Sequence, residues 1–151
     1  RWNICVRSII WEFIMSTLVI DTIQGKTTAG SINVRGEGSN NTNLQQGLTK
    51  AWAGIDAAAN LEGSFNISTS DDDGDGNYGL NFTTNMSDAN YSSVNTVEMA
   101  HNGTSQNPRY TVTNSRTTSS VEIDSSYINS SSVFIFYDGG DVGVQVNGDL
   151  A

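Results

Sequence analysis

The chain has 151 residues and a formal net charge of −9, from 7 Lys and Arg residues against 16 Asp and Glu residues. This balance opposes binding to nucleic acid or to an anionic membrane, because contact with phosphate groups needs clustered Lys and Arg. Charged residues make up only 15% of the chain, against about 25% in ordinary soluble domains. Serine, threonine and asparagine take their place, which favours a β-rich, turn-rich structure. We therefore expect no nucleic-acid partner and no insertion into a membrane.

Residues 1–14 differ in character from the rest of the chain. They are rich in large apolar side chains, yet Arg1, Arg7 and Glu12 interrupt them, whereas a membrane-spanning helix needs about 20 mostly apolar residues. No apolar stretch runs into a small-residue cleavage site, so the segment does not resemble a signal peptide. Because Met15 resembles a natural start, we expect residues 1–14 to be upstream sequence outside the fold. The alternative is a short amphipathic helix that packs on a partner.

Residues 15–60 are predicted to form an attachment and trimerisation segment. Apolar side chains predict short strands over residues 18–23 and 32–34, with a glycine-containing turn between them. Two short strands are marginal in water on their own, so we expect this pair to associate with other copies or with a partner protein. After a linker rich in glycine and asparagine, residues 36–43, apolar side chains three and four residues apart predict one helix over residues 44–53.

The predicted helix over residues 44–53 carries Trp52. Asn43 precedes it as a candidate N-cap. On such a helix, Trp52 shares a face with Leu44 and Leu48. We therefore expect the Trp52 ring to be buried against the β-domain or a neighbouring subunit, and not displayed as a platform for a ligand.

Residues 61–151 are predicted to form a β-domain, because their apolar residues follow the two-residue period of strands. Short apolar runs separated by turn clusters occur at residues 65–67, 78–83, 94–99, 110–113, 121–123, 133–137 and 142–146. About seven such strands predict an all-β fold, an antiparallel β-sandwich or partly open barrel, since no crossover helices lie between them. The run over residues 133–137 is apolar on both faces, so we expect Phe134 and Phe136 in the core or an interface.

Asp71, Asp73 and Asp75 reproduce the first half of a calcium loop, with carboxylates at positions one, three and five and a glycine at position six. The second half is missing, because position twelve, where a glutamate should complete the coordination, is Phe82. We interpret the segment as a solvated hairpin turn, with weak calcium binding as the alternative. No cofactor is expected.

The residues needed for catalysis are not assembled in this sequence. His101 is the only histidine, which excludes sites that need two imidazoles, and no serine lies in a Gly-x-Ser-x-Gly motif. Cys5 is the only cysteine and lies in the atypical first segment. Carboxylate pairs such as Asp138 and Asp141 could cleave glycosidic bonds, but pairs arise by chance in so acidic a chain. We therefore expect a protein that is not an enzyme.

Three tyrosines are candidate ligand-binding residues. Tyr91, Tyr110 and Tyr127 lie beside loops rich in serine and asparagine. There the face of an aromatic ring and the neighbouring amides could hold a sugar, whereas aromatic rings within strands more often belong to a core or an interface.

A series of short motifs runs through residues 15–100. The chain reads Met-Ser-Thr-Leu-Val-Ile-Asp-Thr-Ile-Gln from residue 15, Gly-Ser-Ile-Asn-Val from residue 30 and Lys-Ala-Trp from residue 50. Ser-Phe-Asn-Ile-Ser follows from residue 64, Tyr-Gly-Leu-Asn-Phe-Thr from residue 78, and an Asn-Tyr pair at residue 90. In order and spacing, these motifs resemble the small tail-fibre and appendage proteins of marine bacteriophages of the cyanophage and pelagiphage type.

This resemblance implies a non-enzymatic protein located in the virion, on the surface of a phage tail or capsid. We expect a homotrimer, because a single copy would leave the apolar strands before Gly36 and the run over residues 133–137 partly exposed. We expect it to contact other phage tail or capsid proteins and to project its β-domain for recognition of host-surface polysaccharide. Two alternatives remain open at this point. One is a capsid decoration or cement protein, and the other is a small secreted lectin or glycan hydrolase.

Overall fold

The computed structural model describes residues 18–25, 32–35, 39–98 and 108–151. Residues 1–14, which we expect to lie outside the fold, and His101 fall outside these ranges. The described chain forms eleven strands and one short helix, and every strand pair in it is antiparallel. The predicted all-β class is therefore confirmed. Across the described residues, no helix has the length and apolar character that a membrane crossing requires.

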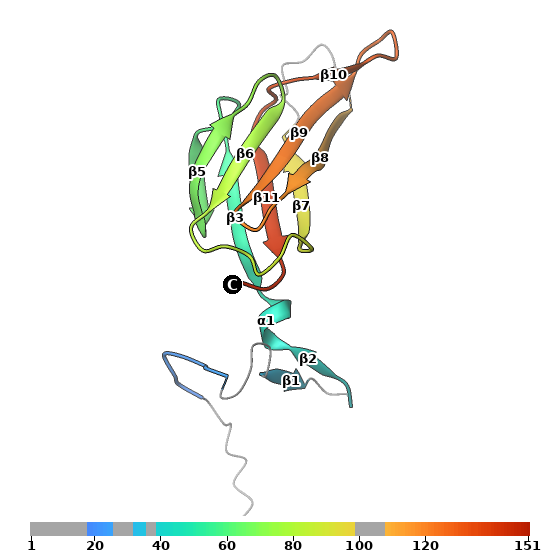
Figure 1. The fold of residues 1–151 in the computed structure, drawn as a ribbon. Helices are drawn as coiled ribbons and strands as arrows, with labels where there is room; N and C mark the ends of the chain where they lie inside the picture. Colours follow the sequence, from blue (N-terminus) through green and yellow to red (C-terminus); the bar gives the residue numbers. More distant parts are fainter. Residues whose placement is uncertain (1–17, 26–31, 36–38, 99–107) are drawn as a thin grey trace, which may run out of the picture.

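Two sheets face each other as a β-sandwich, and a small hairpin and the helix lie at one end of it (Figure 1). The elements are β1 (Asn33–Arg35), β2 (Asn41–Asn43), α1 (Leu44–Gly47), β3 (Thr49–Ile55), β4 (Leu61–Phe65), β5 (Ile67–Asp72), β6 (Asn77–Phe82), β7 (Ser92–Val97), β8 (Arg109–Arg116), β9 (Ser120–Ile128), β10 (Phe134–Phe136) and β11 (Val142–Asn147). The four-stranded sheet has the order β4-β3-β11-β7. The five-stranded sheet has the order β10-β9-β6-β5, with β8 paired to β9. The hairpin consists of β1 and β2.

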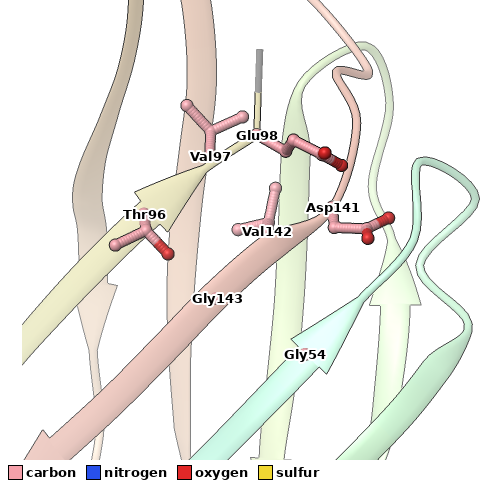
Figure 2. A pocket seen from close by; sticks show the side chains of 7 residues that line it. All are labelled: Gly54, Thr96, Val97, Glu98, Asp141, Val142 and Gly143. Carbon is pink, nitrogen blue, oxygen red and sulfur yellow. The ribbon is translucent and has the colours of Figure 1, made fainter. Parts of the chain in front are cut away.

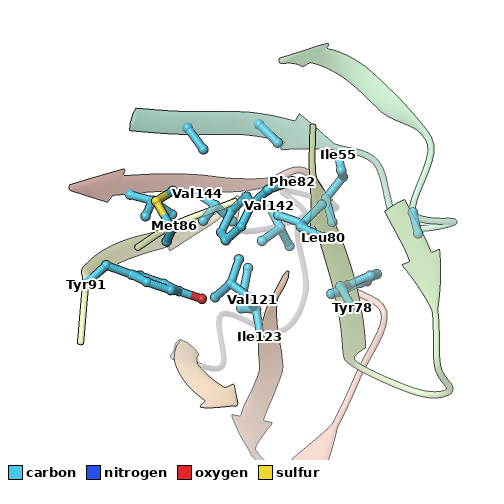
Figure 3. Close-up of a cluster of buried hydrophobic side chains, with 14 residues drawn as sticks. Ile55, Tyr78, Leu80, Phe82, Met86, Tyr91, Val121, Ile123, Val142 and Val144 are labelled. Carbon is cyan, nitrogen blue, oxygen red and sulfur yellow. The ribbon is translucent and has the colours of Figure 1, made fainter. Parts of the chain in front are cut away.

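The core lies between the two sheets and is formed mainly by alternate residues of their strands (Figure 3). On β3, Ala51, Ala53 and Ile55 are buried, while Trp52 between them is exposed. The other buried apolar side chains are Ala59, Tyr78, Leu80, Phe82, Met86, Tyr91, Val121, Ile123, Val142, Val144 and Val146. Burial of each large aliphatic side chain contributes about 1.5–3 kcal/mol, so this layer is the main source of stability in the sandwich.

A single asparagine fastens the corner where the chain passes from one sheet to the other. Asn66 lies between β4 and β5 and has a φ of 58°, a left-handed conformation that asparagine adopts more readily than most residues. Its side-chain amide donates to the carbonyl oxygens of Lys50 and Thr84, both at 3.0 Å. The backbone N–H of Thr84 donates back to the Asn66 side chain at 2.7 Å. The end of β4 is thereby held against β3.

The predicted helix over residues 44–53 is mostly wrong. The helix α1 ends at Gly47, and β3 begins at Thr49. The predicted N-cap is confirmed, since the Asn43 side chain accepts a hydrogen bond from the backbone N–H of Gln46 at 3.1 Å. Residues 49–55 form a strand because they pair with β4 and β11 on either side. The sandwich therefore starts before residue 61, the boundary that the sequence suggested.

The strands predicted before residue 36 are also only partly right. Residues 18–23 form no strand. The segment predicted as 32–34 is β1, and it pairs with β2, which lies in the predicted linker. Leu18, Val19 and Ile23 are more than half exposed, at 78%, 87% and 56%. No strand in the described part of the chain pairs with them.

Phe134 and Phe136 do not lie in the core. Both side chains are 50% exposed and project from the outer face of β10. Their rings contact each other edge to face, with centroids 5.6 Å apart. The expected burial within this chain is therefore wrong for both residues, and their place in an interface stays a prediction.

Candidate ligand-binding face

The outer face of the four-stranded sheet carries a row of large side chains. The register of the strands aligns Phe65, Trp52, Gln145 and Val94 across β4, β3, β11 and β7. Trp52 is 45% exposed in this row. The expected burial of its ring against the β-domain is wrong, because on a strand its side chain points away from Ala51 and Ala53, which face the core.

The next row on this face consists almost entirely of glycine. Gly63, Gly54 and Gly143 pair side by side across β4, β3 and β11, and Thr96 of β7 completes the row. A Cβ atom added to Gly63 would lie 3.5 Å from the Trp52 ring, so the indole lies over this glycine. A Cβ atom added to Gly54 would meet nothing within 4 Å. The row therefore leaves an open floor beside the indole.

Two adjoining open hollows occupy this face, with volumes of about 340 and 380 Å³. The first lies between Trp52 and Val94, and the second lies towards Glu98 and Asp141. Both are lined by Gly143 and Thr96, so the two shallow hollows adjoin each other on this face. We call the two hollows together the trough.

Two carboxylates mark the far end of the trough (Figure 2). Glu98 follows β7 and Asp141 precedes β11, and the backbone N–H of Glu98 donates to the carbonyl oxygen of Asp141 at 2.7 Å. This bond continues the strand pairing beyond Val97 and fixes the two residues side by side. No lysine or arginine is among the residues that line the two hollows. The trough thus combines an aromatic wall, a floor of glycine and an acidic end.

A third carboxylate near this end is used by the fold itself. Asp56 follows β3 and accepts hydrogen bonds from the backbone N–H groups of Ala58 and Asn60 at 2.9 and 2.8 Å. The Asn60 side-chain amide also donates to it, at 2.9 Å. These bonds, that of the Asn60 side chain above all, lower the pKa of Asp56. Asp56 therefore holds the turn after β3 and is not free for a ligand.

The three candidate tyrosines lie in three different environments. Tyr91 is a core residue, 4% exposed, whose hydroxyl donates to the Ser120 carbonyl at 2.6 Å, and burial raises its pKa to about 12. Tyr110 is 41% exposed on β8 of the opposite sheet. Tyr127 packs edge to face on Tyr137, with ring centroids 5.6 Å apart. The structure brings none of them into the trough.

The Tyr127 ring also has a cationic neighbour. The guanidinium carbon of Arg109 lies 4.8 Å from the centroid of Tyr127 and 4.4 Å from that of Tyr137, both within the range of a cation–π interaction. Both rings are therefore occupied by contacts within the chain.

The acidic turn between β5 and β6 is ordered by its own hydrogen bonds. The side chains of Asp71, Asp73 and Asp75 are exposed, and the side chain of Asp71 accepts a bond from the Asn81 amide at 2.7 Å. The neighbouring Asp72 accepts from the backbone N–H of Gly74 at 3.1 Å. Within the described ranges, no group of three or more His, Cys, Asp or Glu side chains is arranged to hold a metal ion.

Comparison of the chain with protein-family models, with curated proteins and with solved structures finds no match. Sequence reasoning missed the trough entirely. The available signal was the alternation of small and large residues through Ala51, Trp52 and Ala53, which fits a strand with one exposed aromatic side chain.

Proposed function

We propose that the protein is a non-enzymatic structural subunit of a bacteriophage virion, a tail-fibre or appendage protein whose sandwich binds host-surface glycan in the trough. The virion role is supported by the order of motifs between residues 15 and 100. The binding role is carried by one observation, the half-exposed Trp52 ring lying over Gly63 beside an open floor.

The chemistry of the trough suits a sugar ring. The face of an aromatic ring carries partial negative charge, so it attracts the C–H groups that cover the apolar face of a pyranose. The hydroxyl groups on the rim of the sugar need hydrogen-bond partners. The amide of Gln145, the hydroxyl of Thr96 and the carboxylates at the acidic end offer donors and acceptors at the surface. Water molecules can bridge the remaining gaps in a shallow site of this kind.

The segment before α1 suits attachment. It carries apolar side chains that the sandwich does not cover, among them Leu18, Val19 and Val34. In Figure 1 this segment and the β1–β2 hairpin lie at one end of the sandwich. The same end can therefore contact other copies or a tail or capsid protein, while the face of the four-stranded sheet stays open to solvent.

The substitution Trp52→Ala tests the binding role on an array of bacterial surface glycans. We expect binding to fall by about ten-fold or more, because the stacking surface is lost. Melting should change far less than for a buried aromatic residue, for which the loss is about 3–5 kcal/mol. The matched control is Tyr110→Ala, which removes a similarly exposed ring from the opposite sheet and should leave binding unchanged.

Two results would contradict the proposal. One is a wild-type protein that binds no glycan on the array. The other is a Tyr110→Ala variant that loses binding while Trp52→Ala keeps it. The non-enzymatic part is checked on the same samples, since a bound oligosaccharide should be recovered after long incubation with its chain length unchanged.

A further inference from the structure

The length of the trough sets the size of ligand that it can hold. Gln145, which neighbours Trp52, and Asp141 at the acidic end are four residues apart on one extended stretch of chain. At about 3.3 Å per residue, the trough is about 13 Å long. A single pyranose ring stacked on the indole would therefore leave the acidic end empty, and a second ring is needed to reach it.

The charges of the trough set the kind of ligand. Glu98 and Asp141 are the charged residues that line it, and no basic side chain among its lining residues offsets them. The whole chain carries a net charge of −9. A uronate, sialate, sulfate or phosphate group placed over the glycine floor would meet like charge without a counter-ion, which disfavours binding. Hydroxyl or amino groups would instead donate hydrogen bonds to the two carboxylates, and such charge-assisted bonds are the stronger ones.

We propose that the trough selects glycans that carry no anionic groups and binds at least two consecutive sugar rings, one on Trp52 and the next over Gly54 and Gly143 beside Glu98 and Asp141. This inference rests on the proposed glycan-binding role. The first ring supplies the stacking area. The second ring lies where the floor has no side chains, and its hydroxyl or amino groups face the acidic end.

The first test measures the selectivity of the wild-type chain on the glycan array, together with titrations of glucose, cellobiose, maltose, deacetylated chitobiose and digalacturonate. The bound set should consist of neutral and amino glycans, and the best disaccharide should bind about ten-fold or more tightly than the monosaccharide. A bound set dominated by uronates, sialates, sulfated or phosphorylated glycans would overturn the inference. Equal binding of the monosaccharide and every disaccharide would overturn it as well. In both cases Trp52-dependent glycan binding, and with it the proposed function, would stand.

The second test fills the trough without removing any chemical group. An added Cβ at Gly54 meets nothing within 4 Å, and valine is favoured in strands. Gly54→Val should therefore fold with an unchanged melting temperature and lose about ten-fold or more in affinity for the best neutral glycan of the array. Unchanged affinity would overturn the placement of the second ring.

The third test concerns the acidic end. The double variant Glu98→Gln and Asp141→Asn should bind the same neutral glycan about ten-fold more weakly and should discriminate less against acidic glycans. The matched control is Asp73→Asn with Asp75→Asn, which removes two exposed charges from the turn between β5 and β6 and should change neither property. Equal effects in the two double variants would show that net charge, and not the trough, sets the preference. A wild-type chain that binds no glycan at all would overturn the proposed function and this inference together.

Discussion

The sandwich and the segment before it contain similar apolar residues, but these residues differ in how far they are exposed to solvent. In the sandwich, Leu80, Val121 and Ile123 are fully buried. In the segment, Leu18 and Val19 remain 78% and 87% exposed. The difference arises from neighbouring strands. Each central strand of the sandwich has a neighbouring strand on both sides and a second sheet across the core. Among the described residues, β1 and β2 pair only with each other, and residues 18–25 pair with no strand.

This comparison indicates that the sandwich buries its own apolar side chains within one copy, whereas the segment before it does not. A two-stranded sheet is at best marginally stable in water, and a contiguous apolar surface on a soluble protein usually marks a contact site. The sandwich should fold as a single copy. The exposed apolar side chains of the segment, such as those of Leu18 and Val19, should become buried only when it meets other copies or another protein.

Removing the segment should have the largest effect, because it should change the oligomeric state of the protein. A chain of residues 15–151 is expected to be a homotrimer, because association of three copies buries the apolar side chains that a single copy exposes. A chain of residues 43–151, which keeps the Asn43 cap, should be a monomer with the same melting temperature for the sandwich. Sedimentation velocity at micromolar concentration distinguishes the two states. A monomer for residues 15–151 would contradict the expectation that the segment associates with other copies.

Truncating one apolar side chain in the sandwich and one in the segment should have different effects on the free energy of unfolding. Leu80→Ala empties a fully buried site and should lower the free energy of unfolding by about 2–5 kcal/mol. Val34→Ala, at a side chain that is 48% exposed, should change the unfolding of the sandwich by less than about 0.5 kcal/mol. Urea titration measures both. A loss of similar size in the two variants would show that the segment and the sandwich unfold as one unit.

Alkaline pH should destabilise the sandwich through its buried tyrosines, since the segment contains none. Burial raises the pKa of Tyr78 and Tyr91 to about 12, whereas an unfolded tyrosine titrates near about 10. Their contribution to stability is therefore present below pH 10 and is lost as the pH rises through 12.

Tyr91→Phe tests this pH dependence. At neutral pH it should cost about 1 kcal/mol, because the hydrogen bond from the Tyr91 hydroxyl to the Ser120 carbonyl is lost. Between pH 10 and 12 the variant should lose less stability than the wild type. The measurement is the midpoint of urea unfolding as a function of pH, and parallel curves for the two proteins would contradict the assignment.

Calcium should have the smallest effect, because the turn between β5 and β6 is ordered by hydrogen bonds within the chain. Millimolar calcium should raise the melting temperature by less than about 5 °C. Replacing Asp71, Asp73 and Asp75 together by asparagine should leave melting nearly unchanged, or ease the repulsion among the carboxylates. A larger rise with calcium that the triple variant abolishes would mean that the sandwich is not complete by itself and needs a bound ion.

The sequence predicted most strands after residue 61 because burial in a two-sided sandwich follows the two-residue period. It failed at residues 44–53, where two periods overlap. Leu44, Leu48 and Trp52 fit a helix, whereas Ala51, Ala53 and Ile55 fit a strand. The outcome depends on β4 and β11, and β11 lies far away in the sequence. Local spacing contains no information about such partners.

A related reason explains why the candidate site could not be predicted from the sequence. The trough exists because Gly63, Gly54 and Gly143 fall into one row, and this alignment depends on the register of three strands. A shift of one residue in any pairing would turn a glycine towards the core and a core residue outwards. Register is set by turns and bulges, among them the irregularity between Gly54 and Ile55.

The glycine floor also has a consequence for how the protein can evolve. A side chain at position 143 would press against Thr96, with its Cβ only 2.6 Å from the Thr96 hydroxyl oxygen, whereas position 54 has free space above it. Folding alone therefore gives no reason for glycine at position 54, and drift would replace it unless the open floor is itself under selection. On the proposed role, single mutations at this position would alter host range without a loss of stability, so position 54 is where phages adapting to a new host should diverge first.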